Sequence, residues 1–374
     1  MNTKQLKIFF LKGGQEQPNT ASYNRFLMLQ QMTALHFDAK VVGFAPNLNR
    51  KIRGNKWING LRYRLNILKG ALMVPRSNRK QTNIIFLLST EPLIFLLVWI
   101  TARFKGNKII NERNEFPETI RQGIRWRVWI YKTTVLWWQY RLLDGLLLMT
   151  DELIHFYSPH TSKKCVIQKL PMTVDFNRFD IKTTENGEEY MFYAGSLSEK
   201  KDGIERLIRA FSKVSQEYPN LSLKIAGAGS SLRTNELIQL INSLGIVSKV
   251  QLLGEVQRTQ MPDLLVNAKI LTLPRPDSIQ ARGGFPTKLG EYLATGKPII
   301  ATRVGEIPNY LTEKELFFIS PQHIERELAE KTFQILENYE KSLEIAKTAK
   351  AKAFQYFSTE ANAKNLKKLI LKIS

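Results

Sequence analysis

The sequence predicts an α/β protein with two doubly wound, Rossmann-like domains that face a central cleft. Short apolar runs alternate with segments of helical periodicity along the chain, which is the pattern of strand–helix units on a parallel sheet. The 374 residues also exceed what a single hydrophobic core usually holds.

The first half is expected to form one such sheet. Its strands are predicted at 6–11, 39–44, 83–88, 107–111, 144–150 and just after 165, with helices near 24–35, 92–103 and 122–143. The basic region between the second and third strands is expected to be irregular. The apolar run 92–100 is shorter than the roughly 20 residues that a membrane-spanning helix needs, so we expect a buried helix of the domain.

The second half repeats the pattern. Strands are predicted at 189–195, 221–227, 249–254, 268–273 and 297–302, followed by a long helical tail from His323. The expected domains are residues 1–172 and 173–354. A final helix, 355–374, is expected to cross back to the first domain.

Charge is distributed unevenly between the two halves. The net charge of the whole chain is +22; residues 1–175 hold 27 basic and 10 acidic side chains, and the remainder holds 28 and 23. The first half therefore carries +17, which favours an anionic partner such as a membrane surface, a nucleic acid or a charged substrate. The single cysteine, Cys165, excludes an internal disulfide. The N-terminal segment lacks the features of a signal peptide, so a cytoplasmic protein is expected.

The most informative segment is RGGFPTKLGEYLATGKP, residues 282–298. Two glycines free the backbone, and Pro286 suits the first turn of a helix. The amides of Thr287, Lys288 and Leu289 would then attract phosphate at the helix N-terminus. Glu291, one turn later, can accept two hydroxyl groups. The alternative interpretation is an ordinary strand–turn–helix with a solvated lysine and glutamate.

Other polar loops follow predicted strands of the same sheet. Gly195 follows one strand, with Lys200 and Lys201 shortly after it, and the segments 225–231 and 252–256 follow the next two. The carboxyl ends of strands in an open parallel sheet are where ligands bind.

In this order, the motifs resemble those of GT-B glycosyltransferases, in particular glycosyltransferase family 4 and its "glycosyl transferases group 1" domain. The resemblance covers residues 185–312 well and is weaker over 142–157 and 170–179. It implies transfer of a sugar from a nucleotide-diphosphate donor with retention at the anomeric carbon. It also implies that the second domain holds the donor and the first holds the acceptor.

No metal and no further cofactor is expected, because the lysines and the helix N-terminus can neutralise the diphosphate and the sequence shows no Asp-x-Asp pair. The resemblance implies the following donor site. The diphosphate would contact Lys201 (or Lys200, one residue earlier) and Lys288, the ribose would contact Glu291, and the base would lie near 254–256. The implied donor-binding residues are Gly13, Gly14, Gly195, Lys200, Lys201, Gly254, Glu255, Val256, Arg282, Phe285, Pro286, Thr287, Lys288, Leu289 and Glu291.

Two positions depart from the family pattern. Gly283 replaces the first of two glutamates spaced eight residues apart, and Asp277 and Arg282 are the alternatives for its role. No histidine follows the strand at 107–111. Glu112 and Glu115 stand there instead, as candidate catalytic carboxylates that orient or deprotonate the acceptor hydroxyl. Ordinary loop charge is the alternative for both.

The segment 121–141 carries five basic residues, no acidic residue and four of the six tryptophans. On a helix, the cations Arg121, Arg125 and Lys132 share one side. The apolar arc beside them is Trp126, Trp129, Ile130, Leu136, Trp137 and Tyr140. This pattern predicts a helix at an anionic membrane interface, and a helix packed on the sheet is the alternative.

Together these features predict a retaining glycosyltransferase that acts on a lipid-linked acceptor at the inner face of the cytoplasmic membrane. The FPTKLGEYLATGKP form resembles a subgroup associated with bacterial surface polysaccharides. A catalytically silent relative that binds nucleotide and supports a partner enzyme is the alternative. Nucleic-acid binding is suggested only by charge, and no nucleic-acid motif accompanies it, so no nucleic-acid partner is expected.

Overall fold

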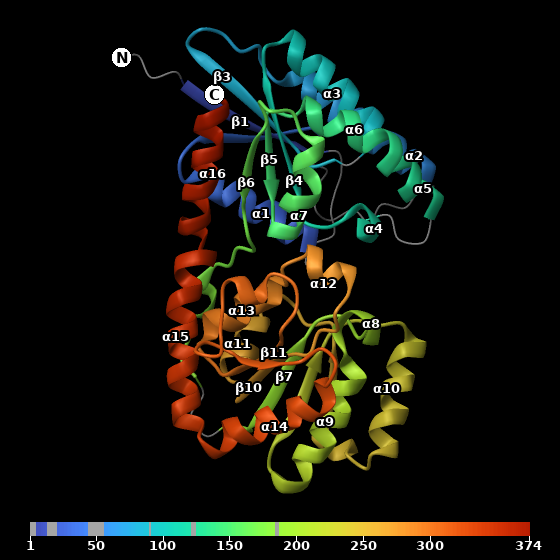
Figure 1. Cartoon of the computed structure of the whole chain (residues 1–374), viewed down its shortest axis with the longest axis vertical. Coiled ribbons are helices and arrows are strands. Elements are labelled where there is room, and N and C mark those ends of the chain that lie inside the picture. The colour runs from blue at the N-terminus through green and yellow to red at the C-terminus, as the bar shows by residue number, and fades with distance from the viewer. Residues whose placement is uncertain (1–4, 13–20, 44–55, 90, 121–124, 184–186) are drawn as a thin grey trace. The chain divides into compact units, whose positions relative to one another are not determined.

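The computed structural model describes residues 5–12, 21–43, 56–89, 91–120, 125–183 and 187–374. The chain divides into two compact units. Unit 1 comprises Met1–Pro171 and Thr359–Ser374, and unit 2 comprises Met172–Ser358 (Figure 1). Each unit is a six-stranded parallel sheet with helices packed on it, which confirms the predicted fold class.

Unit 1 has the strand order β2-β1-β3-β4-β5-β6. The strands are β1 (Gln5–Lys12), β2 (Asp38–Gly43), β3 (Gln81–Leu87), β4 (Lys108–Arg113), β5 (Gly145–Leu148) and β6 (Val166–Lys169). The helices are α1 (Ala21–Ala34), α2 (Lys56–Met73), α3 (Pro92–Phe104), α4 (Pro117–Ile120), α5 (Arg125–Ile130), α6 (Leu136–Gln139), α7 (Asp151–Tyr157) and α16 (Thr359–Ile373).

The helices of unit 1 cover both faces of its sheet. Helices α1 and α16 pack together, and α2, α3 and α6 form a row of neighbours on the opposite face, as right-handed crossovers require. The core between α1, α16 and the sheet contains Phe10, Phe86 and Leu366. Because α16 follows unit 2 in sequence, unit 1 is built from two separate stretches of chain.

Unit 2 has the strand order β12-β11-β10-β7-β8-β9. The strands are β7 (Tyr190–Ala194), β8 (Ser222–Ala226), β9 (Val250–Gly254), β10 (Ile270–Leu273), β11 (Ile299–Thr302) and β12 (Phe317–Ile319). The helices are α8 (Glu199–Asp202), α9 (Ile204–Glu217), α10 (Ser231–Ser243), α11 (Met261–Val266), α12 (Ile279–Gly283), α13 (Thr287–Thr295), α14 (Ile324–Glu337) and α15 (Tyr339–Phe357). The side of α9 that faces the core contains Ile204, Leu207, Ile208, Phe211 and Val214, which recur at helical spacing and are buried.

The predicted strands are present within about two residues. Three expectations were wrong. Helix α2 occupies part of the region expected to be irregular. Its sequence pattern is weak because apolar side chains lie both on its buried side, at Ile67 and Ala71, and on its exposed side. Strand β12 was missed because it has three residues. Helix α3 buries Ile94, Phe95, Val98 and Ala102, but its other side is exposed to solvent, so it is not a buried helix.

The predicted apolar arc of 121–141 is broken. Helix α5 is followed by a π-helical turn, Tyr131–Val135, before α6 begins. A π turn contains an extra residue, which rotates the later side chains relative to the earlier ones. Leu136 and Tyr140 are therefore buried, whereas Trp126, Trp129 and Trp137 are 61%, 66% and 50% exposed. Arg121 lies outside the described residues.

Within the described ranges, no helix combines the length and the apolar character needed to cross a membrane.

Candidate functional site

Three glycines hold the carboxyl edge of the unit 2 sheet closely together. The amide of Gly195, after β7, donates to Ala226 O at 2.8 Å, and the amide of Gly227, after β8, donates to Gly254 O at 2.7 Å. A Cβ atom on Gly227 would lie 1.7 Å from the carbonyl oxygen of Gly195. Only glycine fits at this contact, so the loops after β7, β8 and β9 form one joined surface.

Lys288 lies directly over this surface. It is the second residue of α13, and its Nζ donates to the Tyr193 hydroxyl at 2.9 Å and lies 3.4 Å from Asp202 Oδ1. A Cβ atom on Gly195 would be 1.7 Å from Lys288 Nζ. The missing side chain at Gly195 therefore makes room for the lysine ammonium group.

The environment of Lys288 destabilises its charged form. Burial lowers the pKa of the ammonium group to about 8; the Asp202 carboxylate opposes this, and the positive charges of Arg275 and Lys201 add to it. The positive charges of Arg275 and Lys201 thus act on the ammonium group of Lys288 at the sheet edge, which lies beside the buried carboxylate of Asp202. Such a site gains electrostatic free energy when a polyanion such as a diphosphate enters.

The start of α13 provides further donors. Pro286 is the residue before the helix rather than part of its first turn. The amide of Leu289 donates to Pro286 O at 3.0 Å, so it is already bonded. The amides of Thr287 and Lys288 occupy the first two helical positions, which have no acceptor within the helix. The amide donors that the helix offers to an anion are therefore Thr287 and Lys288.

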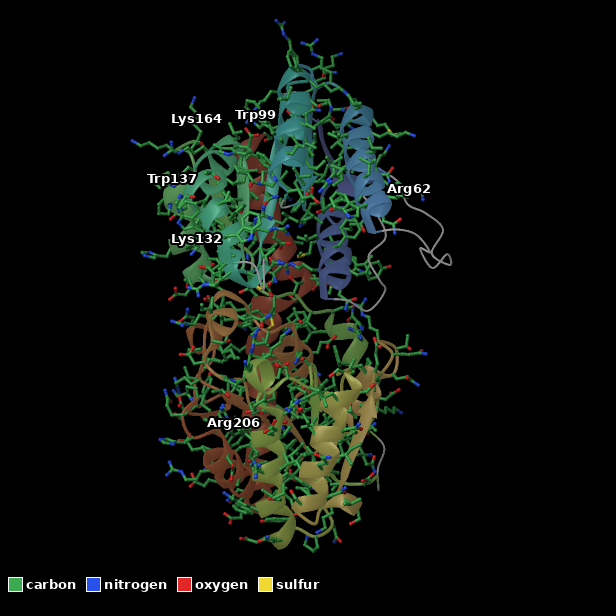
Figure 2. All side chains as sticks on the ribbon, turned by 90° about the vertical axis from the view of Figure 1, so that its right-hand side faces the viewer. Arg62, Trp99, Lys132, Trp137, Lys164 and Arg206 are labelled. Atoms are coloured by element: carbon green, nitrogen blue, oxygen red, sulfur yellow. The ribbon has the colours of Figure 1, made fainter. Side chains whose placement is uncertain are left out.

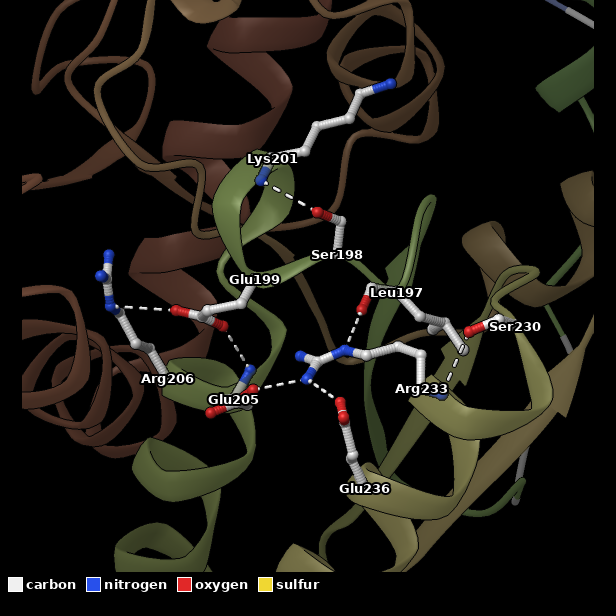
Figure 3. Close-up of polar contacts among 9 residues, drawn as sticks. All are labelled: Leu197, Ser198, Glu199, Lys201, Glu205, Arg206, Ser230, Arg233 and Glu236. Carbon is white, nitrogen blue, oxygen red and sulfur yellow. Dashed lines mark hydrogen bonds and ion pairs between the residues drawn. The ribbon is translucent and has the colours of Figure 1, made fainter. Parts of the chain in front are cut away.

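Lys201 lies beside a network of ion pairs around α8, α9 and α10 (Figure 3). Ser198 caps α8 by accepting from the Lys201 amide at 3.3 Å, and the Lys201 side chain points away from the network. The other charges pair among themselves: Glu199 with Arg206 at 3.1 Å, and Arg233 with Glu205 at 2.6 Å and with Glu236 at 2.9 Å. Lys200 is exposed, and its charge is not among those that act on Lys288, which favours Lys201 of the two.

Glu291 lies on α13 one turn after Lys288. Its Oε1 accepts from Arg178 Nη1 at 2.9 Å, and Arg178 Nη2 donates to Arg258 O at 3.0 Å. Arg178 comes from the segment that enters unit 2, so this ion pair orients the carboxylate of Glu291.

The remaining predicted donor residues have different surroundings. Phe285 is buried and packs its ring against Tyr310 and Phe357, so it supports the loop rather than facing solvent. Arg282 is exposed, with its Nε 3.6 Å from Asp277 Oδ1. Gly254, Glu255 and Val256 lie at the end of β9, on the same sheet edge. Gly13 and Gly14 lie outside the described residues.

The two candidate carboxylates of unit 1 differ in accessibility. Glu112 is 4% exposed, and its Oε1 accepts from Arg25 Nη2 at 2.6 Å and Nε at 2.8 Å. Arg25 also donates to Pro171 O at 3.1 Å, so the pair fixes the end of unit 1. Glu115 is half-buried in the bend after β4, where its main-chain oxygen accepts from the Tyr157 hydroxyl at 3.3 Å. Burial and ion pairing argue against Glu112 as a base and favour Glu115.

Sequence reasoning missed four side chains at the unit 2 site: Tyr193, Asp202, Arg275 and Arg178. Arg275 had a usable signal, because it follows directly after β10 at the carboxyl edge. The described residues contain no cluster of three or more His, Cys, Asp or Glu side chains that could hold a metal ion.

A comparison with protein families finds a match to a family model over residues 175–352. This segment, just under half of the chain, matches the family model "Glycosyl transferases group 1". It contains every described side chain of the unit 2 site.

Two curated relatives match a part of the chain. One is the phosphatidylinositol N-acetylglucosaminyltransferase gpi3 subunit of Schizosaccharomyces pombe, 27% identical over 137 residues, 37% of this chain and 28% of the relative. The other is the N-acetyl-alpha-D-glucosaminyl L-malate synthase of Bacillus anthracis, 24% identical over 157 residues, 42% of this chain and 39% of the relative. The chain thus matches well under half the length of each.

The fold extends over the whole chain. The solved structure of Anabaena HepE in complex with UDP-glucose superimposes with a TM-score of 0.69, at 17% identity, over 97% of this chain and 99% of that one. The two Rossmann-like units are those of the GT-B fold. The chain therefore has the GT-B fold, and its residues 175–352 match the group 1 glycosyltransferase family model.

Proposed function

We propose that the protein transfers a hexose-type sugar, with retention of configuration, from a nucleotide-diphosphate sugar to a lipid-linked acceptor in bacterial surface glycan synthesis. The observation that carries the donor half of this proposal is the position of Lys288. Its ammonium group lies against Gly195 at the carboxyl edge of a parallel sheet, and its helix, α13, offers its first amides to an anion.

The proposed chemistry follows from these charges. When the bond between the anomeric carbon and the diphosphate breaks, negative charge grows on the phosphate oxygens. Lys288, Lys201 and the α13 amides would stabilise that charge without a metal ion. Glu291, oriented by Arg178, would bind the ribose hydroxyls. Glu115 would take the proton of the acceptor hydroxyl.

UDP is the nucleotide to test first. The printed title of the HepE structure describes a UDP-glucose complex, and both curated relatives are named for glucosamine-containing products or transfer. These names support a UDP-sugar donor here as a proposal.

The acceptor half rests on unit 1. An anionic membrane would contact exposed or half-exposed side chains of α5, α6 and the π turn. These side chains are Arg125, Trp126, Trp129, Lys132 and Trp137. We place the enzyme on the inner face of the cytoplasmic membrane, where a lipid-linked acceptor would be available.

A panel of UDP-, GDP- and dTDP-sugars tests the donor assignment. Binding of at least one nucleotide should raise the melting temperature, and Lys288→Ala should abolish that rise. Because this variant leaves the buried Asp202 without its ion-pair partner, the rise is measured against the variant's own unliganded melting temperature. If no nucleotide raises the melting temperature of the wild-type protein, the donor site is wrongly assigned.

A silent relative remains the second candidate because of one observation. Gly283, at the position of the family's first glutamate, is buried and offers no carboxylate to the sugar. Nucleotide binding without hydrolysis or transfer for any donor, with lipid extracts supplied as acceptor, would favour the silent relative over the enzyme.

A further inference from the structure

Helices α2 and α3 lie side by side and run in the same direction. Arg64 Nε, in α2, lies 2.7 Å from Oε2 of Glu91, the residue before α3. At the other end, Lys105 Nζ, just after α3, donates to the main-chain oxygens of Leu72 at 2.5 Å and Val74 at 2.8 Å. The two helices therefore form one surface, seen in the upper part of Figure 2 with Arg62 on α2.

Each helix presents a row of exposed apolar side chains on that surface. On α3 the row is Leu93, Leu97, Ile100 and Phe104, and on α2 it is Trp57, Leu61, Leu65 and Leu72. At 100° per residue these rows occupy arcs of about 60° and about 80°. The most exposed members are Trp57 at 85% and Phe104 at 80%. We name these eight side chains the α2–α3 stripe.

The N-terminal half of α2 buries little of itself. All residues from Leu61 to Leu65 are exposed, so this part of the helix has little packing to stabilise it. Most helical stability in proteins comes from such packing, and short helices alone are marginal in water. An apolar environment over the stripe would supply the missing stabilisation.

The charges around the stripe indicate what that environment is. Helices α2, α3, α5 and α6 contain no aspartate or glutamate. Their described side chains include the cations Arg62, Arg64, Lys69, Arg103, Arg125 and Arg127, of which Arg64 pairs with Glu91 and Arg103 with Asp144. Two copies of such a surface would repel each other across a dimer interface. Apolar side chains flanked by cations, with tryptophan among them, suit the boundary between acyl chains and anionic headgroups.

We propose that the α2–α3 stripe inserts into the headgroup–acyl boundary of an anionic membrane, as a second contact beside α5 and α6. This inference extends the membrane part of the proposed function and is independent of donor binding. The two contacts would bind the membrane through different forces. The stripe binds by removing apolar surface from water, which salt does not weaken, whereas the cations around α5 and α6 bind through charge, which salt screens.

Vesicle flotation with phosphatidylglycerol/phosphatidylcholine mixtures tests the proposal at low and high salt. The test variant is Trp57→Ser/Leu61→Ser/Phe104→Ser, and the matched control is Leu232→Ser/Ile238→Ser, which removes exposed apolar side chains from α10 of unit 2. All these side chains are exposed, so both variants should fold, and circular dichroism checks this.

The wild-type protein should retain part of its vesicle binding in 0.5 M salt. The stripe variant should lose at least roughly tenfold in partition coefficient at both salt concentrations, because each inserted side chain contributes on the scale of apolar burial. The control should match wild type. Quenching of Trp57 by brominated lipid, measured as the difference from Trp57→Phe, should report its depth.

Two results would overturn the proposal. One is unchanged vesicle binding by the stripe variant at both salt concentrations. The other is a wild-type dimer, seen by light scattering, that the stripe variant dissociates, because the stripe would then bind a second copy. Nucleotide-induced stabilisation, measured on the same samples, reports separately on the proposed function and should be equal in all three proteins.

Discussion

The helices around the two sheets have opposite surface chemistry. In the part of the chain that the structure describes, fifteen of the twenty-seven exposed large apolar side chains lie on α2, α3, α5 and α6 of unit 1. The helices of unit 2 expose fewer such side chains and carry acids as well as bases, some of them paired, as in Lys213–Glu325 at 2.8 Å and Arg206–Glu199 at 3.1 Å. Unit 2 thus has the surface of a protein surrounded by water, and unit 1 has a face that suits an apolar, anionic boundary.

The difference also separates two uses of positive charge. At the unit 2 site, a few cations are placed at fixed positions around Gly195, where they can recognise one small anion. On unit 1, the cations are spread over several helices, and no fixed geometry is needed to attract a charged surface. Substitutions confined to one unit should therefore change one kind of binding and leave the other unchanged.

The largest effect is expected from charge reversal on α5. Arg125→Glu/Arg127→Glu should weaken binding to anionic vesicles by roughly 100-fold or more at low salt, since each cation near such a surface contributes on the order of 1 kcal/mol and reversal counts twice. The matched control is Lys331→Glu/Lys341→Glu, which makes the same change of net charge on α14 and α15. Flotation assays measure both, and equal losses would mean that net charge alone, not the face of unit 1, controls binding.

The second effect concerns the stability of unit 1. Glu112→Ala should lower the free energy of unfolding by about 3 kcal/mol, because it leaves the buried Arg25 without its carboxylate. Urea unfolding measures the loss, and Arg25→Met/Glu112→Leu should recover much of it. Nucleotide binding by the folded variant should be unchanged. A Glu112→Ala protein of normal stability but greatly slowed transfer would instead assign Glu112 to catalysis.

The third effect is confined to unit 2. Lys288→Ala should weaken UDP binding by roughly 30-fold, which corresponds to the loss of about 2 kcal/mol from a charged hydrogen bond. Calorimetric titration measures this, and vesicle binding should not change. The control is Lys249→Ala, a half-buried lysine that precedes β9 at the opposite edge of the same sheet. Similar losses in both variants would contradict the placement of the site.

The smallest effect is a dependence on pH. Since the pKa of Lys288 is lowered to about 8, its ammonium group loses its proton as the pH rises through that value. UDP affinity should therefore fall up to about tenfold between pH 7 and pH 9. Asp202→Asn removes the carboxylate that favours the charged form, so the fall should move to lower pH. A flat profile in the wild-type protein would show that Lys288 does not contact the phosphates.

Sequence periodicity predicted most strands and the position of Lys288, because both depend on local pattern. It did not predict the partners of Lys288. Asp202 of α8 and Tyr193 of β7 reach Lys288 of α13 only because the fold brings these elements together at one sheet edge. Residues so far apart in sequence share no local signal. The same limit applies to Arg178, which pairs with Glu291 across 113 positions.

The predicted apolar arc of 121–141 was wrong for a different reason. The predicted arc assumes that successive side chains of 121–141 turn by 100° about the helix axis, as in a regular α-helix. The π turn breaks this regular rotation in the middle of the segment. Helix α2 was missed because its apolar side chains lie both on the buried side, at Ile67 and Ala71, and in the exposed row of the α2–α3 stripe, so its sequence shows no single apolar face. Where burial does not confine the apolar residues to one side of a helix, sequence periodicity does not predict that helix.

The return of α16 to unit 1 has a consequence for biosynthesis. Leu366, Leu369 and Ile370 of α16 complete the core that Phe10 and Phe86 begin, yet all of unit 2 is translated between them. Unit 2 is continuous and can fold as soon as it leaves the ribosome. One face of the unit 1 sheet stays uncovered until α16 has been synthesised. The first domain in sequence is therefore the last to reach its native state.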